Sequence, residues 1–489
     1  MSIKTSNASS NNSALATIIS VFFFWGFVAA SNGILIPVLK NHFTLSQFES
    51  QLVDTAFYIA YGVGSLIYFI WSMTAGDPLN KIGYKKGLVI GLIISSIGAL
   101  LFIPAVNFNE YLYFLIGLFF IAFGFSLLQI VANPFVINLG DPSKGSFRLN
   151  LAGSINSLGT SVGPVLFAYS LYGSANAQAV KDIGMEAVKI PFIILSGLLF
   201  FLAIFLNFSK LPTIVNEEEK EQSIGAFKYP QLTLGMLAIF IYVGVEVAIG
   251  SNLPALVGHI KNLESDKIAN VAAPFVSLYW GSLMIGRWTG AINVFNMSKK
   301  TKTFLNIFIP FVAFGVVLFF NHVRGTEISE LFIYAVWIII FIIANFMAQE
   351  KPAKTLMLFG ISASIMMLIG IFSKGDIAIF SFMSGGLFCS VMWPCIFNLA
   401  IAGLGKYTNQ GSSLLVMMII GGAFIPPIQG LICDMEKSHP NGIMGVSYTQ
   451  FSYIVAIICF LYLAWYALKV KTILLKQGID YDKKSETGH

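Results

Sequence analysis

The chain has 489 residues, of which 56% are hydrophobic and only 11% are charged, and its mean hydropathy is +0.78. A soluble globular protein has roughly 25% charged residues, so this composition excludes a soluble fold. The formal net charge of +6 does not indicate nucleic-acid binding, because a small basic surplus in a membrane protein comes from Lys and Arg in cytoplasmic loops.

The first part of the chain reads as a short polar tail followed by six apolar spans. Residues 1–13 are rich in Ser and Asn and lack the basic region of a signal peptide, so we expect a disordered tail. The spans make an N-terminal half over residues 14–209, with about 20 apolar residues in each span. The charged run that follows predicts a solvated cytoplasmic linker over residues 210–229.

The second part of the chain, residues 230–470, contains about eight apolar spans, which brings the expected total to about fourteen. A cytoplasmic tail is expected over residues 471–489. Lysines gather in alternate loops, as at Lys81, Lys144 and Lys299. The positive-inside rule then predicts that both termini are cytoplasmic. The expected fold class is an all-α polytopic membrane protein.

Short motifs in the first part recur in the second part and reveal a duplication. Residues 64–66 recur at 281–283, an offset of 281 − 64 = 217, whereas residues 133–134 match 393–394, an offset of 393 − 133 = 260. The increase, 260 − 217 = 43 residues, is about the length of a hairpin that crosses the membrane twice. We therefore predict one inserted hairpin within residues 296–376, and duplicated halves place a solute site between them near the midplane.

Five segments resemble the fucose permease and glucose/galactose permease branch of the major facilitator superfamily in order and spacing. They are residues 32–37, 132–140, 147–152, 286–290 and 411–417. The resemblance implies the major facilitator fold of two six-helix halves, to which this chain adds the hairpin. It also implies a secondary active transporter in a bacterial inner membrane, which takes up a neutral sugar (a hexose or a related compound) by cation symport and alternating access.

Two carboxylates of fucose permease relatives are missing from this chain. Gly33 stands where a membrane Asp follows the first-helix Asn, and Gln129 stands where a membrane Glu precedes the fourth-helix Asn-Pro. Coupling therefore needs another acid inside an apolar span. Asp54, helped by Thr55, is the candidate ligand of a coupling Na⁺, the favoured ion, although it can also be an interface residue near the extracellular mouth. If H⁺ drives uptake instead, Glu246 or Asp54 is the candidate carrier.

Polar and aromatic side chains inside the spans predict a site for an uncharged, hydroxyl-rich solute. Gln129 and Asn133 are four residues apart, so their amides share one helix face and can both donate to and accept from vicinal hydroxyls. Indole rings can pack on the apolar faces of a pyranose. Each of these polar residues, taken singly, can instead form a hydrogen bond that holds two helices together. The candidate sugar-binding residues are Asn32, Gln129, Asn133, Asn156, Glu246, Asn252, Trp280 and Trp393.

The segment Gly76 to Lys86 is similar to the superfamily's cytoplasmic loop between the second and third helices, which implies a role in gating. Its glycines permit a tight turn, and its lysines can pair with helix-end carbonyls in one of the two access states. The same lysines can also be ordinary positive-inside residues. Two arginines at expected cytoplasmic helix ends have the same two interpretations. The gating candidates are Gly76, Lys81, Gly83, Lys85, Arg148 and Arg287.

Three other functions fit parts of the sequence. An uncoupled sugar facilitator fits the duplication, but Asp54 and Glu246 then need structural roles. A membrane enzyme or lipid flippase is disfavoured, because the spans contain no metal-ligand constellation of His, Asp and Glu. A nutrient sensor needs an output domain, and the expected tails are short. We therefore expect no enzyme activity, no cofactor beside the coupling ion, no nucleic-acid partner, and a monomer in the lipid bilayer.

The first testable prediction concerns topology. About fourteen spans and cytoplasmic lysine loops require that a reporter fused after His489 is active on the cytoplasmic side. A second fusion in the linker at residues 210–229 must give the same result, since six spans precede it. A periplasmic reading at His489 contradicts the even number of spans.

Overall fold

The structure is a computed structural model. It describes residues 8–45, 47–172, 184–212, 225–439, 442–443 and 445–480. The side chains of Asn32 and Asp54 lie outside the described residues. Within the described ranges the chain is helical, and its only β feature is an isolated bridge between Ile443 and Val446. The expected all-α class is confirmed.

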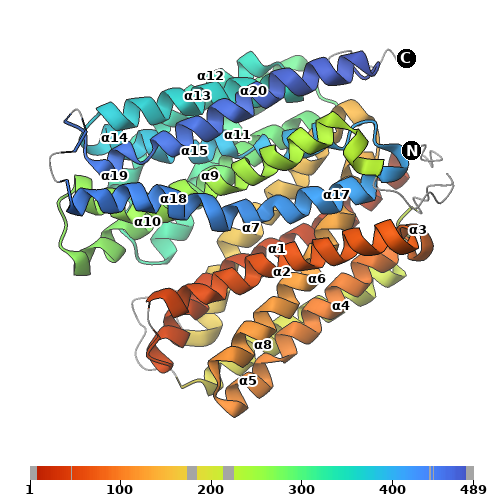
Figure 1. The fold of residues 1–489 in the computed structure, drawn as a ribbon, viewed down its shortest axis with the longest axis horizontal. Coiled ribbons are helices and arrows are strands. Elements are labelled where there is room, and N and C mark those ends of the chain that lie inside the picture. Colours follow the sequence, from red (N-terminus) through yellow and green to blue (C-terminus); the bar gives the residue numbers. More distant parts are fainter. Residues whose placement is uncertain are drawn as a thin grey trace. The chain divides into compact units, whose positions relative to one another are not determined.

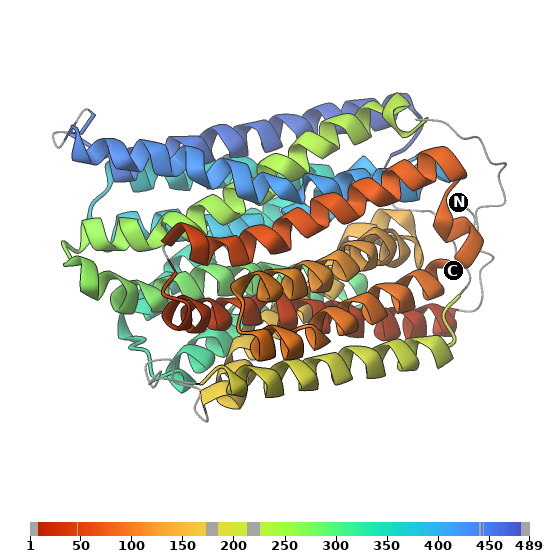
Figure 2. The same ribbon diagram turned by 60° about the horizontal axis from the view of Figure 1, so that its bottom comes forward.

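Contacts within the chain divide it into two compact units. Unit 1 is residues 1–145, 152–229 and 403–418, and unit 2 is residues 146–151, 230–402 and 419–489. A short part of the C-terminal half, 403–418, thus groups with the N-terminal half. Within each unit the long helices lie side by side, as two views show (Figure 1, Figure 2).

Unit 1 is a bundle in which α4 packs against both α6 and α8, and α2 packs against α6 and α17 (Figure 1). Its long helices consist mainly of apolar residues, as a lipid environment requires. The helices are α1 (Ala8–His42), α2 (Gln47–Ala75), α3 (Pro78–Ile82), α4 (Tyr84–Leu100), α5 (Phe102–Phe108), α6 (Tyr111–Asn138), most of α7 (Gly145–Tyr172), α8 (Glu186–Phe208) and α17 (Thr408–Met417).

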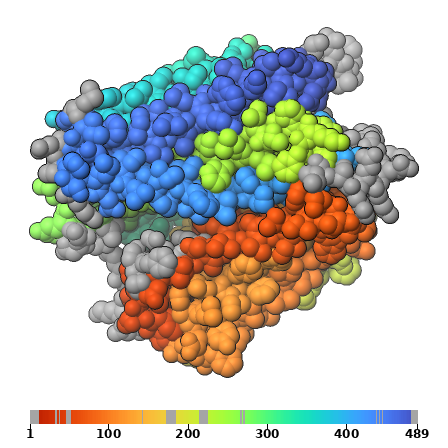
Figure 3. All heavy atoms as spheres, viewed as in Figure 1, coloured from red at the N-terminus to blue at the C-terminus, as the bar shows by residue number. Residues whose placement is uncertain are grey.

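Unit 2 is built around α9, which packs against α10, α16, α18 and α20. In the space-filling view the atoms of α9 lie among those of α18 and α20 (Figure 3). The helices are α9 (Pro230–Ile260), α10 (Ser265–Ala291), α11 (Lys299–Val323), α12 (Ala335–Ala348), α13 (Pro352–Phe372), α14 (Gly375–Met383), α15 (Gly385–Cys389), α16 (Met392–Ala400), α18 (Gly421–Asp434), α19 (Tyr448–Phe451) and α20 (Ile454–Lys476).

The described residues contain twelve helical segments that are long and apolar enough to cross a membrane. Some of these spans are composite, because α14, α15 and α16 together form one of them. Helices α7 and α10, of 28 and 27 residues, are long enough but fall outside this set. The expected count of about fourteen is therefore not confirmed. Residues 296–376, where the sequence predicts the hairpin, hold α11, α12 and α13.

Helix ends differ from the expected boundaries at both tails. Helix α1 begins at Ala8, inside the tail predicted to be disordered, because a helix can extend through Ser and Asn when its later turns are apolar and packed. Helix α20 continues to Lys476, inside the expected C-terminal tail. Most of the predicted linker, residues 213–224, lies outside the described residues, and a 3-10 turn at Gly225–Lys228 follows it.

Small residues let α4 and α6 approach closely. A Cβ atom added to Gly124 of α6 would collide with the Ser95 hydroxyl and the Gly91 carbonyl of α4. The Ser95 hydroxyl also donates to the Ile121 carbonyl across this contact, at 2.9 Å. Close backbone approach through small residues replaces the hydrophobic driving force that is missing within a bilayer.

The contact between α4 and α6 generates a stability prediction. Gly124→Ala forces the two helices apart and is expected to lower the free energy of unfolding in detergent by about 1 to 3 kcal/mol. Gly197→Ala on α8 is the matched control, because no atom lies within 4 Å of its added Cβ. Since alanine is the better helix former, the control is expected to be neutral or slightly stabilising. Equal melting temperatures for the two variants contradict the packing account.

Candidate functional site

The buried face of α6 carries two amides that the rest of the described chain does not satisfy. Gln129 is 2% exposed and Asn133 is 0% exposed, and their spacing puts both on one helix face. Gln129 Oε1 and both amide atoms of Asn133 have no hydrogen-bond partner among the described residues. A buried polar group without a partner is destabilising by roughly 1 to 3 kcal/mol. Water or a polar solute must therefore complete these hydrogen bonds.

A tyrosine hydroxyl of α2 lies near the Gln129 amide and near an indole of α1. The hydroxyl of Tyr61 on α2 is within electrostatic range of Gln129 and of Trp25 on α1. Tyr61 is buried, whereas Trp25 is half-buried. Tyr61, Gln129 and Trp25 thus offer a hydroxyl, an amide and an indole, which is the usual lining of a site for a neutral polar solute. The sequence analysis missed Tyr61, because its helix is aromatic throughout and one phenol carries no local signal.

Asn156, another sugar-binding candidate, has a structural partner. Its Nδ2 donates to the Phe22 carbonyl at 2.9 Å and so joins α7 to α1. A Cβ added to the adjacent Gly26 would collide with the Asn156 carbonyl, so the two helices are in close contact here. In this structure Asn156 therefore serves to hydrogen-bond two helices together.

In unit 2 a carboxylate and a guanidinium lie near one another inside the apolar helices. Glu246 on α9 is half-buried and within electrostatic range of Tyr242 and of Arg287 on α10. The Tyr279 hydroxyl donates to the backbone carbonyl of Glu246 at 2.6 Å. The Cys389 thiol also lies within electrostatic range of Glu246. Arg287, expected at a helix end, thus lies one turn inside α10, where it can compensate the Glu246 charge.

The remaining candidates of unit 2 are dispersed along several helices. Trp393 is half-buried, with its ring centroid 6.2 Å from that of Tyr242. Near it in sequence, both amide atoms of Asn398 are buried without a partner in the described chain. Trp280 is 40% exposed and packs edge-on against Tyr279. Asn252 donates to the Ala248 carbonyl of its own helix at 2.9 Å. The structure thus brings two of the candidates, Glu246 and Trp393, next to the same residue, Tyr242, which was not itself a candidate.

The loop after α2 contains two glycines with positive φ and two lysines that bind backbone carbonyls. Gly76 and Gly83 have φ of 78° and 83°, values that favour glycine. Lys81 Nζ donates to the Ala75 carbonyl at 2.9 Å, and Lys85 Nζ donates to the Ser209 carbonyl at 2.9 Å. Both acceptors lie at helix C-terminal ends, where a cation is favourable. Arg148 is buried, at 7% exposure.

Asp77 of the same loop organises a network that the sequence analysis missed. Its carboxylate accepts from the Tyr68 hydroxyl at 2.5 Å, from Asn409 Nδ2 at 2.6 Å and from the Leu79 amide at 2.9 Å. The Tyr84 hydroxyl donates to Asn409 Oδ1. The network joins α17 to the start of α3 and α4. Asp before Pro is a helix-start signal that identifies Asp77 as an N-cap, but no local pattern identifies Asn409.

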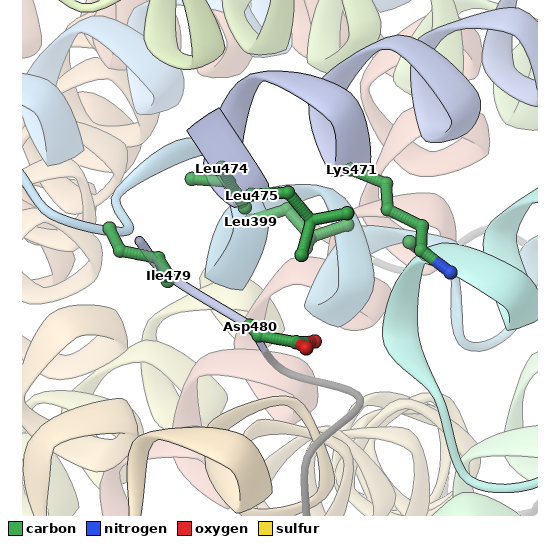
Figure 4. Close-up of a pocket in the computed structure, with 7 residues that line it drawn as sticks. Leu399, Lys471, Leu474, Leu475, Ile479 and Asp480 are labelled. Carbon is green, nitrogen blue, oxygen red and sulfur yellow. The ribbon is translucent and has the colours of Figure 1, made fainter. Parts of the chain in front are cut away.

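The proposed sodium ligands, Asp54 and Thr55, lie only partly within the described residues. Thr55 is exposed on α2, and the Asp54 side chain lies outside the described residues. The described residues contain no group of three or more His, Cys, Asp or Glu that could hold a metal ion. A small cavity at the end of α20, lined by Leu399, Lys471 and Asp480 among others, has a volume of about 20 Å³ (Figure 4). It holds about one water molecule and is too small for a sugar.

Comparison with known proteins identifies the family. A family model described as Major Facilitator Superfamily matches residues 15–351. The chain belongs to the major facilitator superfamily. This major facilitator chain is therefore a multi-pass membrane transporter and not an enzyme.

Its relatives confirm the resemblance seen in the sequence. The chain is 34% identical to a protein named glucose/galactose transporter from Brucella abortus biovar 1 (strain 9-941), over 95% of this chain and 96% of the relative. It is 28% identical to the L-fucose-proton symporter of Escherichia coli (strain K12), over 87% and 88%. A crystal structure of the E. coli fucose:proton symporter FucP has a similar fold, with a TM-score of 0.70, 23% identity, and coverage of 94% and 99%.

The unsatisfied amide of Asn133 generates a prediction with an unusual sign. Asn133→Leu removes a buried group without a protein partner, so the solute-free transporter is expected to gain about 1 to 3 kcal/mol of stability while it loses affinity for its solute. Asn156→Leu is the matched control, and it is expected to lose about 1 kcal/mol because it removes the interhelical hydrogen bond from Asn156 Nδ2 to the Phe22 carbonyl. Thermal unfolding in detergent separates the two. A similar loss in both variants shows that Asn133 is structural.

Proposed function

We propose that this transporter takes up a neutral hexose or a related sugar by symport with protons, through alternating access. The observation that carries the proposal is a set of buried amide atoms without a hydrogen-bond partner in the described chain, Gln129 Oε1 and both amide atoms of Asn133. Amides offer both donors and acceptors, which suits the vicinal hydroxyls of a sugar. The names of the relatives, glucose/galactose transporter and L-fucose-proton symporter, agree with a sugar substrate.

Protons replace sodium as the proposed coupling ion. The sodium preference rested on Asp54 and Thr55, and nothing in the comparisons supports it, whereas one relative is named a proton symporter. Glu246 is the proposed proton carrier because it lies inside the apolar helices near Arg287. When Glu246 is ionised, Arg287 compensates its charge, and when it is protonated, Arg287 must find other acceptors. The groups that face Glu246 are Tyr242 of α9, Tyr279 and Arg287 of α10, and Cys389 of α15.

We further propose that α7 and α10 also cross the membrane, which gives fourteen spans, with both termini cytoplasmic and a single chain as the transporting unit. The packing within each unit supports an insertion. In unit 1 the third span, α4, packs against the last span, α8, and in unit 2 it is α13 that packs against the last span, α20. By this analogy α11 and α12 are the inserted hairpin. They pack on each other, and Asn345 Nδ2 donates to Asn306 Oδ1 between them at 3.0 Å.

Uptake by membrane vesicles tests the proposed function. Labelled hexoses are supplied under an imposed pH gradient and, separately, under an imposed Na⁺ gradient. The pH gradient is expected to drive accumulation and the Na⁺ gradient is not. Glu246→Gln is expected to abolish gradient-driven accumulation but to retain exchange of sugar across the membrane, because a permanently neutral side chain still permits the conformational cycle of the loaded protein.

Glu330→Gln is the matched control for Glu246→Gln. Glu330 is exposed in a 3-10 helix (Ser329–Tyr334) and pairs with Lys261 at 2.7 Å, so its loss is expected to leave accumulation unchanged. Accumulation driven by Na⁺ alone contradicts proton coupling and makes Asp54 the leading cation ligand. Failure to transport any hexose under either gradient contradicts the sugar substrate itself.

A further inference from the structure

Two prolines occupy corresponding places in the duplicated halves, and each leaves a backbone carbonyl without its helical donor. Pro134 lies inside α6, whereas Pro394 lies in the first turn of α16, after the break at Ser390 and Val391 that separates α15 from α16; they are the prolines of the repeat at 133–134 and 393–394. A proline has no N–H, so inside α6 the carbonyl four residues before Pro134 loses its normal partner. The carbonyl four residues before Pro394 lies in the break before α16, and Pro394 likewise offers it no backbone donor. These carbonyls belong to Ile130 and Ser390.

In each unit a side chain from a neighbouring helix donates to the freed carbonyl. The Ser412 hydroxyl of α17 donates to the Ile130 carbonyl at 2.9 Å, and Ser412 is 0% exposed. Arg287 Nε of α10 donates to the Ser390 carbonyl at 3.3 Å. A freed carbonyl within a membrane helix must be satisfied by such a neighbour, since lipid offers no donor. A carbonyl four residues before a proline therefore accepts from a neighbouring helix in each unit.

We propose that Ser412 is a positioning residue whose hydroxyl replaces the amide that Pro134 lacks, and that this bond ties the placement of α17 to the shape of α6. Ile130 lies on the turn of α6 that carries Gln129 and Asn133, the two unsatisfied amides. A helix that lacks a backbone hydrogen bond at proline bends there, and the donor that occupies the freed carbonyl determines the bend. Displacement of α17 therefore alters the position of the proposed sugar-binding amides.

The surroundings of Ser412 suit a segment that can be released. Helix α17 is also held to unit 1 by Asn409, which binds Asp77 and Tyr84, and by Gln410 Oε1, which accepts from the Ala226 amide at 3.2 Å. After α17 the chain forms a 3-10 turn at Met418–Ile420, and the division between the units falls in that turn. Helix α17 is thus a short element with polar anchors and an irregular turn at its end, as is typical of hinged segments.

A double-mutant cycle between Ser412 and Pro134 tests the proposal. Ser412→Ala in the wild-type background is expected to lower the melting temperature and to weaken sugar binding by about threefold to tenfold, the usual size of one hydrogen bond. Pro134→Ala restores an amide to the Ile130 carbonyl. In that background Ser412→Ala is expected to change the sugar affinity by less than about twofold. The melting temperature is expected to change correspondingly little. Equal effects of Ser412→Ala in the two backgrounds overturn the proposal.

Two further variants guard against a Pro134→Ala protein that does not fold. Ser412→Thr keeps the hydroxyl and Ser412→Val has nearly the same shape without it, so only the valine variant is expected to weaken binding; equal behaviour of the two overturns the proposal. Ser413→Ala is the matched control, because the Ser413 hydroxyl donates to the Gln410 carbonyl of its own helix at 2.8 Å. The affinity readout rests on the proposed sugar transport. The melting readout does not, so a wild-type protein that binds no hexose contradicts only the proposed function.

Discussion

Every polar group within the apolar spans must find a partner inside the protein, because the bilayer offers none. Helices satisfy their own backbones, and the exceptions to that rule define the informative places in this chain. Asn156 and Asn345 satisfy the rule by bonds to neighbouring helices. Gln129, Asn133 and Asn398 are buried and do not satisfy it within the described chain. The buried amide side chains thus separate into two groups. Some hold helices together, and others have amide atoms that only a solute or water can pair within the described chain.

Much of the fold follows from local sequence pattern. Apolar runs predict the helices, the alternating lysines predict an orientation, and the spacing of Gln129 and Asn133 predicts that they share a helix face. Loop chemistry is predicted as well, since Lys81 and Lys85 do donate to carbonyls at helix ends. These features depend on residues within one or two turns of each other, where the helical period fixes the geometry. The family follows from short segments whose order and spacing resemble it along most of the chain, except the predicted hairpin and the tails.

The pairings between distant helices could not be predicted in the same way. Asp77 and Asn409 are separated by 332 residues, and no periodicity links them. Glu246 and Arg287 lie on different helices, so their proximity depends on how α9 and α10 pack. For the same reason sequence cannot tell Asn133 from Asn156, since both are amides in apolar helices. Their different roles depend on whether a carbonyl of another helix lies within reach.

The two units have kept the same proline while their surrounding chemistry has diverged. Around Pro134 the nearby polar groups are neutral: the amides of Gln129 and Asn133, the Tyr61 phenol and the Ser412 hydroxyl. Around Pro394 the donor to the freed carbonyl is the Arg287 guanidinium, which also interacts with Glu246. A neutral environment recognises hydroxyls without a change of charge, whereas a carboxylate beside a guanidinium responds to a proton by redistributing hydrogen bonds. Under the proposed proton coupling, a proton that binds Glu246 would free Arg287 to strengthen its bond to the Ser390 carbonyl, and the change in charge would thereby reach the segment that leads into α16, which carries Trp393.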